Sequence, residues 1–362
     1  MTGISSNSDA RLAVEQLLNQ AVAQRASDLH IEPTASGYDL KLRVDGLLQT
    51  QSKLPIAVGR SYVTRLMVLA QLLTYRQDIP QEGRLRLSLP SGPAADNDID
   101  LRLAIMPTTH GMRAVVRLPA ELVSQHALDT LGLPEPVLKL FYDFAKADSG
   151  MLLVTGPAGS GKTTSIYALL EHIAQLQPGL SLISLEDPVE RDLPAVTQIE
   201  IQPHGELTFD RVLRSVLRQD PQVLMIGEIR DRQTASIAVQ AALTGHRLIA
   251  TMHAGTPAGA IARLLEMHLE PYQISSALYG VTSLRLLRKS DGQGSYKGRI
   301  PVGEAAYMDD TLRAQMRVVS DASQLAHAIA QQLTYRSMKD IAVDLVQAGV
   351  TDQQEIDRIL GS

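Results

Sequence analysis

The sequence predicts an α/β protein in which a parallel sheet flanked by helices follows a smaller α+β domain. Three observations support this fold class. Apolar runs of strand length alternate with helix-like stretches over residues 151–251, a pattern typical of a parallel sheet. A glycine-rich loop joins the first of these runs to a predicted helix. Residues 38–118 contain segments that alternate apolar and polar side chains, as half-buried strands do.

The composition is that of a globular protein with enough apolar material for two cores. The chain has 362 residues, of which 44% are hydrophobic and 20% are charged. Its net charge of −5 argues against a nucleic-acid-binding protein, since such proteins usually carry a basic excess. The absence of cysteine excludes disulfides and thiolate metal sites.

No targeting or membrane-spanning segment is visible in the sequence. The N-terminus lacks the basic and apolar regions of a signal peptide, and no run of about 18 apolar residues occurs. We therefore expect a cytoplasmic protein that reaches a membrane only through partners.

The first domain is predicted to occupy residues 1–118 and to mix helices with strands. Asp9 is a candidate N-cap for a helix over residues 9–24, and the pair Asp45-Gly46 is a hairpin turn signal. Apolar periodicity predicts a further helix over 54–73 and strands over 38–44, 84–89, 98–106 and 114–118. Residues 119–133, which contain proline and serine, are predicted to form a linker.

The second domain is predicted to occupy residues 134–362. Apolar runs predict buried strands at 151–154, 180–185, 223–226 and 248–251, with helices at 165–176, 208–217 and 232–243 between them. From about residue 291 we expect a C-terminal helical subdomain, with helices over 322–332 and 337–348. Residues 351–355 resemble a capping box that opens a last short helix.

Residues 156–163 fit the pattern G-x-x-x-x-G-K-[ST] of a phosphate-binding loop without mismatch. Glycines let backbone N–H groups turn toward an anion, and the following helix adds its positive dipole end. Lys162 is expected to reach the β- and γ-phosphates of ATP, and Thr163 to hold Mg²⁺. A chance glycine turn would lack the strand before it and the helix after it. The predicted nucleotide-binding residues are Gly156, Pro157, Ala158, Gly159, Ser160, Gly161, Lys162, Thr163 and Thr164.

Three predicted strands end on polar side chains, namely Glu186-Asp187, Glu228 and His253. Because the carboxyl ends of parallel strands meet at one edge of a sheet, we expect these groups beside the phosphate-binding loop. Glu228 is expected to act at Mg²⁺, directly or through water. Either Glu186 or Glu228 orients or activates the attacking water, and the sequence leaves both open.

His253 is predicted to sense the γ-phosphate. A lone histidine is more often structural than catalytic, but this one follows a buried strand at the edge where the loop lies. A zinc site is not expected, because His246 and His253 lie seven residues apart and the chain has no cysteine.

Four ordered segments resemble those of the type II secretion / type IV pilus assembly ATPase family. They are GPAGSGKTT, SLEDPVE, LRSVLRQDPQVLMIGEIRD and AALTGHRLIATMHAG, which match the family's Walker A, Asp-box, Walker B and His-box segments. ASDLHIEP, KLRVDGLLQ, DIDLRLAIMPTTHGMRAVVRL and YKGRIPVGEAAYMDD resemble other parts of the family, so the resemblance covers about residues 10–360. It implies a RecA-like P-loop ATPase core, preceded by a PAS-like α+β domain.

The resemblance also implies a homo-hexamer in which arginines complete each ATP site. Arg84, Arg102, Arg214 and Arg218 match the family's positions, and the last two lie four apart on one face of a predicted helix. Arginine suits this role because its planar, always charged guanidinium binds phosphate oxygens in pairs. The implied cofactors are ATP and Mg²⁺. The implied partners are an inner-membrane platform protein and cytoplasmic assembly proteins of the same machine.

The chain departs from the family pattern in several places. It is interpreted as a short form that lacks the extra N-terminal partner-binding domain. The segment SDGQGSYKG stands where many members carry a four-cysteine zinc loop, so no zinc is expected. The family's HGE, QRL and TLHT segments read HGM, LRL and TMHA here. These changes leave the predicted ATP-site residues in place.

The function predicted from these observations is ATP hydrolysis that drives pilin or pseudopilin assembly in a type IV pilus, type II secretion or competence system. Pilus retraction is an alternative, because the short length is similar to that of retraction motors. Nucleic-acid translocation is a second alternative, although the negative charge, three Phe and no Trp argue against base stacking. A non-hydrolysing scaffold is disfavoured by the presence of Lys162, Glu186 and Glu228.

Overall fold

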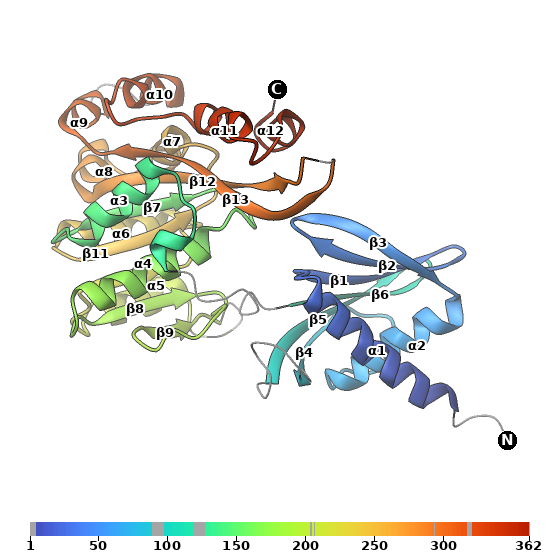
Figure 1. Cartoon of the computed structure of the whole chain (residues 1–362). Helices are drawn as coiled ribbons and strands as arrows, with labels where there is room; N and C mark the ends of the chain where they lie inside the picture. Colours follow the sequence, from blue (N-terminus) through green and yellow to red (C-terminus); the bar gives the residue numbers. More distant parts are fainter. Residues whose placement is uncertain are drawn as a thin grey trace. The chain divides into compact units, whose positions relative to one another are not determined.

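The computed structural model describes residues 5–88, 98–118, 127–202, 205, 207–292, 294–316 and 321–361. The chain divides into two units, Met1–Ser124 and Gln125–Ser362, which run from blue to teal and from green to red in Figure 1. Residues 119–126, the first part of the linker predicted over 119–133, lie outside the described residues.

In the first unit, a sheet of six described strands carries two helices on one face (Figure 1). The strand order is β3-β2-β1-β6-β5-β4, and every neighbouring pair is antiparallel. This arrangement agrees with the predicted PAS-like α+β domain. The elements are α1 Ser5–Ala23, β1 Asp28–Thr34, β2 Gly37–Val44, β3 Leu47–Leu54, α2 Ile56–Leu69, β4 Gln81–Ser88, β5 Asp98–Thr108 and β6 Gly111–Arg117.

The core of the first unit lies between its sheet and its helices. Leu29 and Ile31 of β1 and Leu42 of β2 are completely buried, and they cluster with Leu18 of α1 and Leu66 of α2. Burial of each such side chain stabilises the fold by about 1.5–3 kcal/mol. Because side chains alternate along a strand, the residues between these leucines and isoleucines point to the other face of the sheet.

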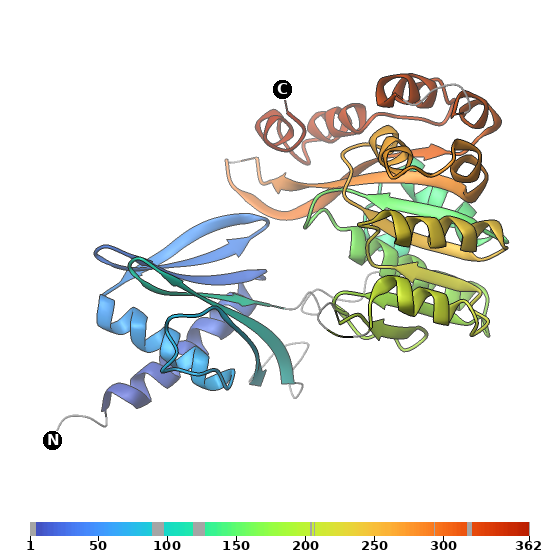
Figure 2. The same ribbon diagram turned by 180° about the vertical axis from the view of Figure 1, so that it is seen from behind.

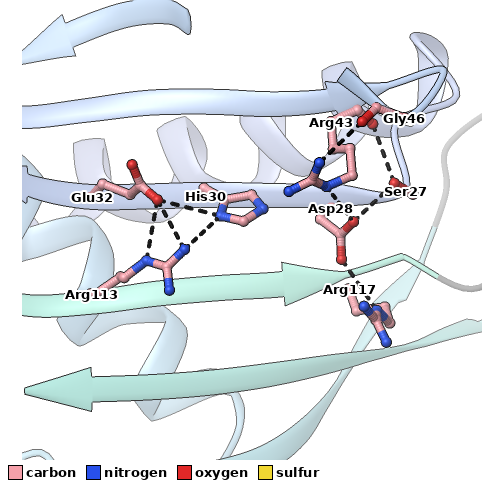
Figure 3. A network of polar contacts seen from close by, with 8 residues as sticks. All are labelled: Ser27, Asp28, His30, Glu32, Arg43, Gly46, Arg113 and Arg117. Atoms are coloured by element: carbon pink, nitrogen blue, oxygen red, sulfur yellow. Dashed lines mark hydrogen bonds and ion pairs between the residues drawn. The ribbon is translucent and has the colours of Figure 1, made fainter. Parts of the chain in front are cut away.

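That other face of β1 is polar, and apolar periodicity does not predict this strand (Figure 3). Asp28 Oδ1 accepts a hydrogen bond from Arg117 Nε at 3.2 Å, and Glu32 Oε1 accepts one from Arg113 Nη2 at 2.9 Å. Both pairs tie β1 to β6. Burial acts to raise the pKa of Glu32, but hydrogen bonds from Lys41 and Arg113 outweigh burial and hold that pKa below its ordinary value.

The second unit is built on a sheet of seven described strands in the order β13-β12-β7-β11-β10-β8-β9. Neighbouring strands are parallel except for the edge pair β12–β13. The strands predicted at 151–154, 180–185, 223–226 and 248–251 are confirmed as β7 Gly150–Thr155, β8 Leu182–Glu186, β10 Val223–Ile226 and β11 Arg247–Met252. The prediction missed β9 Thr197–Glu200, β12 Leu278–Ser290 and β13 Tyr296–Tyr307.

Two hydrophobic clusters cover the two faces of this sheet. Met151 and Leu153 of β7 belong to the cluster that includes α6 Arg232–Leu243, whereas Leu152 and Val154 belong to the cluster that includes α4 Lys162–Leu176. Figures 1 and 2 show α4 and α6 on opposite faces. Strands buried on both faces read as continuous apolar runs, which is why the sequence predicts them. The other helical elements of this part are η2 Leu128–Thr130, α3 Glu135–Ala145, α5 Phe209–Val216, α7 Pro257–Glu266 and α8 Pro271–Ala277.

The C-terminal stretch predicted as helical from about residue 291 begins with a strand, β13, and its helices follow. Leu287 of β12 and Val302 of β13 form a separate apolar cluster with Ile341 and Ile356. This cluster packs the last two helices on the β12–β13 hairpin. The helices are α9 Asp310–Met316, α10 Ala322–Ala330, α11 Met338–Gln347 and α12 Gln353–Leu360.

A buried carboxylate links the last helix, α12, to strand β12. Glu355 of α12 is 0% exposed, and it accepts hydrogen bonds from Arg288 Nη2 at 2.7 Å and Arg358 Nη2 at 2.6 Å. The predicted start of α12 is correct, because the Asp352 side chain caps it by accepting the N–H of Glu355 at 2.9 Å. Burial acts to raise the pKa of Glu355, but the hydrogen bonds from Arg358 and Arg288 lower it to about 2.

We expect Glu355→Gln to lower the free energy of unfolding by about 3 kcal/mol, because it leaves two arginines against a neutral amide. Asp344→Asn is the matched control, since Asp344 pairs with Arg336 with side chains 55% and 48% exposed. Such surface pairs contribute below about 1 kcal/mol. Urea unfolding of the full chain measures both variants, and equal losses would contradict the role of Glu355.

The effect of Glu355→Gln on the free energy of unfolding should depend on pH. Because the pKa of Glu355 in the fold, about 2, lies below its ordinary 4.5, its stabilising contribution is present above pH 4.5 and is lost as the pH falls toward 2. The difference in free energy of unfolding between wild type and Glu355→Gln should therefore decrease as the pH falls from 4.5 toward 2.

Candidate nucleotide-binding site

The glycine-rich loop leaves the end of β7 and runs directly into α4. Gly156, Gly159 and Gly161 have φ angles of +144°, +74° and +92°, a region that residues with a side chain rarely adopt. Gly161 is the N-cap of α4, whose first residue is Lys162. The loop therefore has the glycine-dependent backbone that a phosphate cradle requires.

Close packing at the base of the loop also requires glycine. A Cβ atom on Gly156 would lie 2.5 Å from the carbonyl oxygen of Leu284 and 2.5 Å from Ser160 Oγ. Ser160 is itself buried, and its hydroxyl finds no hydrogen-bond partner among the described residues. A buried hydroxyl within a glycine cradle is a suitable donor to a phosphate oxygen.

Lys162 lies over this loop from the N-terminus of α4. Its Nζ donates hydrogen bonds to the carbonyl oxygens of Gly156 at 2.8 Å and Pro157 at 2.9 Å. Burial lowers the pKa of Lys162, since a charged ammonium is less stable away from water. The remaining predicted loop residues, Pro157, Ala158 and Thr164, are exposed.

Beside the loop is an acidic pocket at the carboxyl edge of the sheet. The parallel register pairs Leu185 of β8 with Ile226 of β10, so the residues that follow these strands are neighbours. The pocket thereby brings together Thr163, Glu186 and Glu228, as the sequence predicts. Its lining residues are Thr163, Glu186, Asp187, Pro188, Glu190, Phe209, Met225, Gly227, Glu228 and Arg230.

Glu186 is the more deeply buried of the two predicted catalytic carboxylates, with 2% of its surface exposed. Its Oε1 accepts hydrogen bonds from Ser184 Oγ at 2.6 Å and Gln198 Nε2 at 3.0 Å. Its Oε2 accepts a hydrogen bond from the hydroxyl of Tyr167. Both carboxylate oxygens are therefore bound by donors of the protein itself.

Glu228 lies closer to solvent, with 17% of its side chain exposed. His253 Nε2 is 3.1 Å from Glu228 Oε1, and Arg230 Nε donates to Glu228 Oε2 at 2.6 Å. The structure thus brings the predicted sensor His253 directly to Glu228. Arg230 also lies 3.6 Å from Asp187, so one guanidinium links two acidic residues of the pocket.

Two of the four predicted arginines lie in the first unit and two in the second. Arg84 of β4 and Arg102 of β5 are exposed and occupy directly opposite positions of an antiparallel pair in the first unit. Arg214 of α5 lines a second, open pocket together with Arg232 of α6. The helix α5 ends at Val216, so Arg218 lies beyond it, and the expectation that Arg214 and Arg218 share one helix face is wrong.

Tyr167, Gln198 and Arg230 are site residues that the sequence reasoning missed. Tyr167 lies four residues after Thr163, which places both on one face of α4 and is a signal that the sequence contains. Arg230 follows Glu228 in GEIRD at strand-like spacing. Gln198 lies on β9, a short and partly exposed strand, and no sequence signal points to it.

Among the described residues, neither a cluster of metal-binding side chains nor a membrane-spanning helix is present. No group of three or more histidine, aspartate or glutamate side chains there could hold a metal ion. In the same ranges, every helix is too short or too polar to cross a bilayer.

Comparison with known proteins identifies the family. The family model described as Type II/IV secretion system protein matches residues 6–358. The Type II secretion system protein HxcR of Pseudomonas aeruginosa is 37% identical, covering 96% of this chain and 76% of the relative. The Type IV pilus assembly ATPase PilB of Thermus thermophilus is 34% identical, covering 96% of this chain but 43% of that protein.

The fold has a close counterpart among solved structures. The X-ray structure of the Yersinia pseudotuberculosis ATPase DotB aligns with a TM-score of 0.79 at 21% identity, covering 95% of this chain and 92% of that chain. This likeness confirms the predicted RecA-like α/β fold. Since the family model spans almost the whole sequence and two relatives exceed 30% identity, the chain belongs to the Type II/IV secretion system protein family.

Proposed function

We propose that this chain is an ATPase that couples ATP hydrolysis to the assembly of pilin or pseudopilin subunits. The observation that carries the proposal is a pocket lined both by Thr163, at the start of the loop helix, and by Glu228, at the end of a parallel strand. Their oxygens are ligands of the kind that Mg²⁺ prefers. Residues 156–164 adjoin this pocket and supply the phosphate cradle.

Each part of the cradle has a role toward a triphosphate. The backbone N–H groups of the loop and the N-terminus of α4 attract phosphate oxygens. Lys162 adds a full positive charge, and the buried hydroxyl of Ser160 adds a donor. Mg²⁺ held by Thr163 and Glu228, directly or through water, would neutralise phosphate charge during the reaction.

We assign the attacking water to Glu228 rather than Glu186. Glu186 is almost fully buried, with 2% of its surface exposed, so it has little access to water. Glu228 is partly exposed at the pocket and contacts His253, which is in turn 49% exposed. Glu228 can therefore reach water. His253, which contacts Glu228, is placed to sense whether a γ-phosphate is bound. Glu186 supports the site from behind.

The names of the relatives support the role in a secretion or pilus machine. At 34–37% identity they are a type II secretion protein and a pilus assembly ATPase, which favours assembly over retraction. We infer a homo-hexamer that works on an inner-membrane platform protein. Arg84 and Arg102 are proposed to bind phosphate oxygens jointly, and their opposite positions on β4 and β5 support this role. Arg214 and Arg218 stay predictions.

Lys162→Ala should weaken ATP binding by about 100-fold, because it removes a charge-assisted contact with the phosphates. The matched control is Lys139→Ala, since Lys139 pairs with Asp143 on the surface of α3 at 2.7 Å. Equilibrium binding of a fluorescent ATP analogue measures both variants. Wild-type affinity in Lys162→Ala would remove the loop from the proposed site.

Glu228→Gln should retain ATP binding and lower turnover by about 10²–10⁴-fold, since an amide cannot take a proton from water. Phosphate release under saturating Mg²⁺ and ATP measures turnover, and the binding assay verifies that the site is filled. Normal hydrolysis by this variant would show that the catalytic assignment is wrong.

Arg102→Ala should lower turnover at least about tenfold in the assembled protein, because arginines stabilise the charge that develops on a transferred phosphoryl group. Arg86→Ala is the matched control, since Arg86 lies two residues from Arg84 on β4 and pairs with Asp100 at 3.1 Å. Activity is measured across protein concentrations that span assembly, with the oligomeric state followed by light scattering. An equal loss in dissociated protein would remove any role that depends on assembly.

A further inference from the structure

We propose that Tyr167 is a positioning residue for hydrolysis, whose hydroxyl holds Glu186 and the segment 187–190 against the loop helix α4. The inference rests on the proposed function, because it assigns a role within the same site. Tyr167 does not line the pocket, so it acts through the residues that it holds.

The hydroxyl of Tyr167 makes contacts on both sides of the acidic segment. It donates a hydrogen bond to Glu186 Oε2 and accepts one from the backbone N–H of Glu190 at 3.3 Å. Tyr167 is 3% exposed. Burial, together with the neighbouring Glu186 carboxylate, raises the pKa of Tyr167, so the phenol keeps the proton that it donates.

The position of Tyr167 on α4 links these contacts to the phosphate-binding loop. Thr163 and Tyr167 lie four residues apart, one turn of helix, and so point to the same side. Thr163 Oγ1 contacts Glu190 Oε1 at 3.5 Å. The first turns of α4 therefore hold Glu190 through its side chain at Thr163 and through its backbone at Tyr167.

Gln198 of β9 makes a second set of contacts with Glu186 and with the residues that follow the segment 187–190. Gln198 Nε2 donates both to Glu186 at 3.0 Å and to the carbonyl oxygen of Arg191 at 2.9 Å, and its Oε1 accepts the N–H of Leu193 at 2.7 Å. The Arg191 guanidinium lies 5.5 Å from the centre of the Tyr167 ring. The strand end, the acidic segment and α4 thus form one hydrogen-bonded unit with Glu186 at its centre.

The substitution Tyr167→Phe distinguishes the role of the hydroxyl from that of the packed ring. It preserves the buried ring and its volume and removes only the hydroxyl. Glu186 Oε2 then loses a donor in a place that water barely reaches, and the N–H of Glu190 loses its acceptor. The segment that carries Asp187 and Glu190 to the pocket then loses its contacts with Tyr167 and keeps those with Gln198 and Thr163, so it is held less firmly, while the loop keeps all of its residues.

The test compares Tyr167→Phe with Tyr335→Phe. Tyr335 is a matched control, because its hydroxyl also donates to a buried carboxylate, Glu304 Oε2 at 2.8 Å, in the C-terminal layer. We expect Tyr167→Phe to lower kcat by about 10- to 100-fold, the loss typical when an outer hydrogen-bond partner of a site residue is removed. ATP affinity should stay within about twofold of wild type, since the loop is intact. Tyr335→Phe should keep wild-type kcat.

A double mutant shows whether Tyr167 acts through Glu186. In a Glu186→Ala background the hydroxyl has already lost its carboxylate and keeps only the N–H of Glu190, so adding Tyr167→Phe should lower kcat by a smaller factor than it does in the wild type. Additive losses, or a kcat for Tyr167→Phe equal to that of wild type, would overturn the proposal. If Glu186→Ala does not fold, the comparison with Tyr335→Phe still decides, because an equal loss of kcat in both variants would show a general structural effect.

Failure of this inference is distinguishable from failure of the proposed function. An inactive Glu228→Gln variant beside a fully active Tyr167→Phe variant would reject only the role of Tyr167. A fully active Glu228→Gln variant would reject the proposed catalytic site itself.

Discussion

Parallel pairing of β10 with β8 on one side and with β11 on the other is the constraint on which the site depends. It aligns three strand ends at one edge of the sheet, so that residues distant in sequence become neighbours. Gly227, directly after β10, permits the closest approach, since a Cβ there would lie 2.9 Å from the carbonyl oxygen of Leu185. The hydrophobic clusters on both faces hold these strands in register, and Glu186, Glu228 and His253 lie where the strands end.

Glu186 and Glu228 both lie at strand ends, but they differ in burial, and we assign them different roles for that reason. Glu186 lies within the protein, where Tyr167, Ser184 and Gln198 satisfy its oxygens. A buried carboxylate costs free energy unless it is hydrogen-bonded in this way, and once bonded it rigidifies its surroundings. Glu228 meets solvent instead, beside His253 and Arg230. We therefore propose that Glu186 organises the pocket and that Glu228 carries out the chemistry.

The sequence predicts the loop, the sheet edge and the family because each has a strong local signal. The loop has a spacing motif, and β7, β8, β10 and β11 are apolar runs buried on both faces. The hairpin β12–β13 was not predicted, because polar side chains interrupt the apolar pattern of its strands. One of them, Arg288, turns to the buried Glu355, a partner 67 residues away. The roles of Tyr167 and Gln198 depend on such long-range contacts too, and residue type alone does not reveal them. Arg218 lies beyond both the helix predicted over 208–217 and the observed α5, which ends at Val216, so its four-residue spacing from Arg214 does not place the two on one helix face.

The central claim is that the loop at residues 156–163 and the carboxylate Glu228 form one site for Mg²⁺ and ATP. The most direct measurement is a structure determined with Mg²⁺ and a non-hydrolysable ATP analogue. Our account predicts phosphates on the loop, Mg²⁺ on Thr163, Glu228 at the metal or its water, and Glu186 still bonded to Tyr167. A nucleotide bound elsewhere, or a metal held by Glu186 with Glu228 turned away, would contradict it.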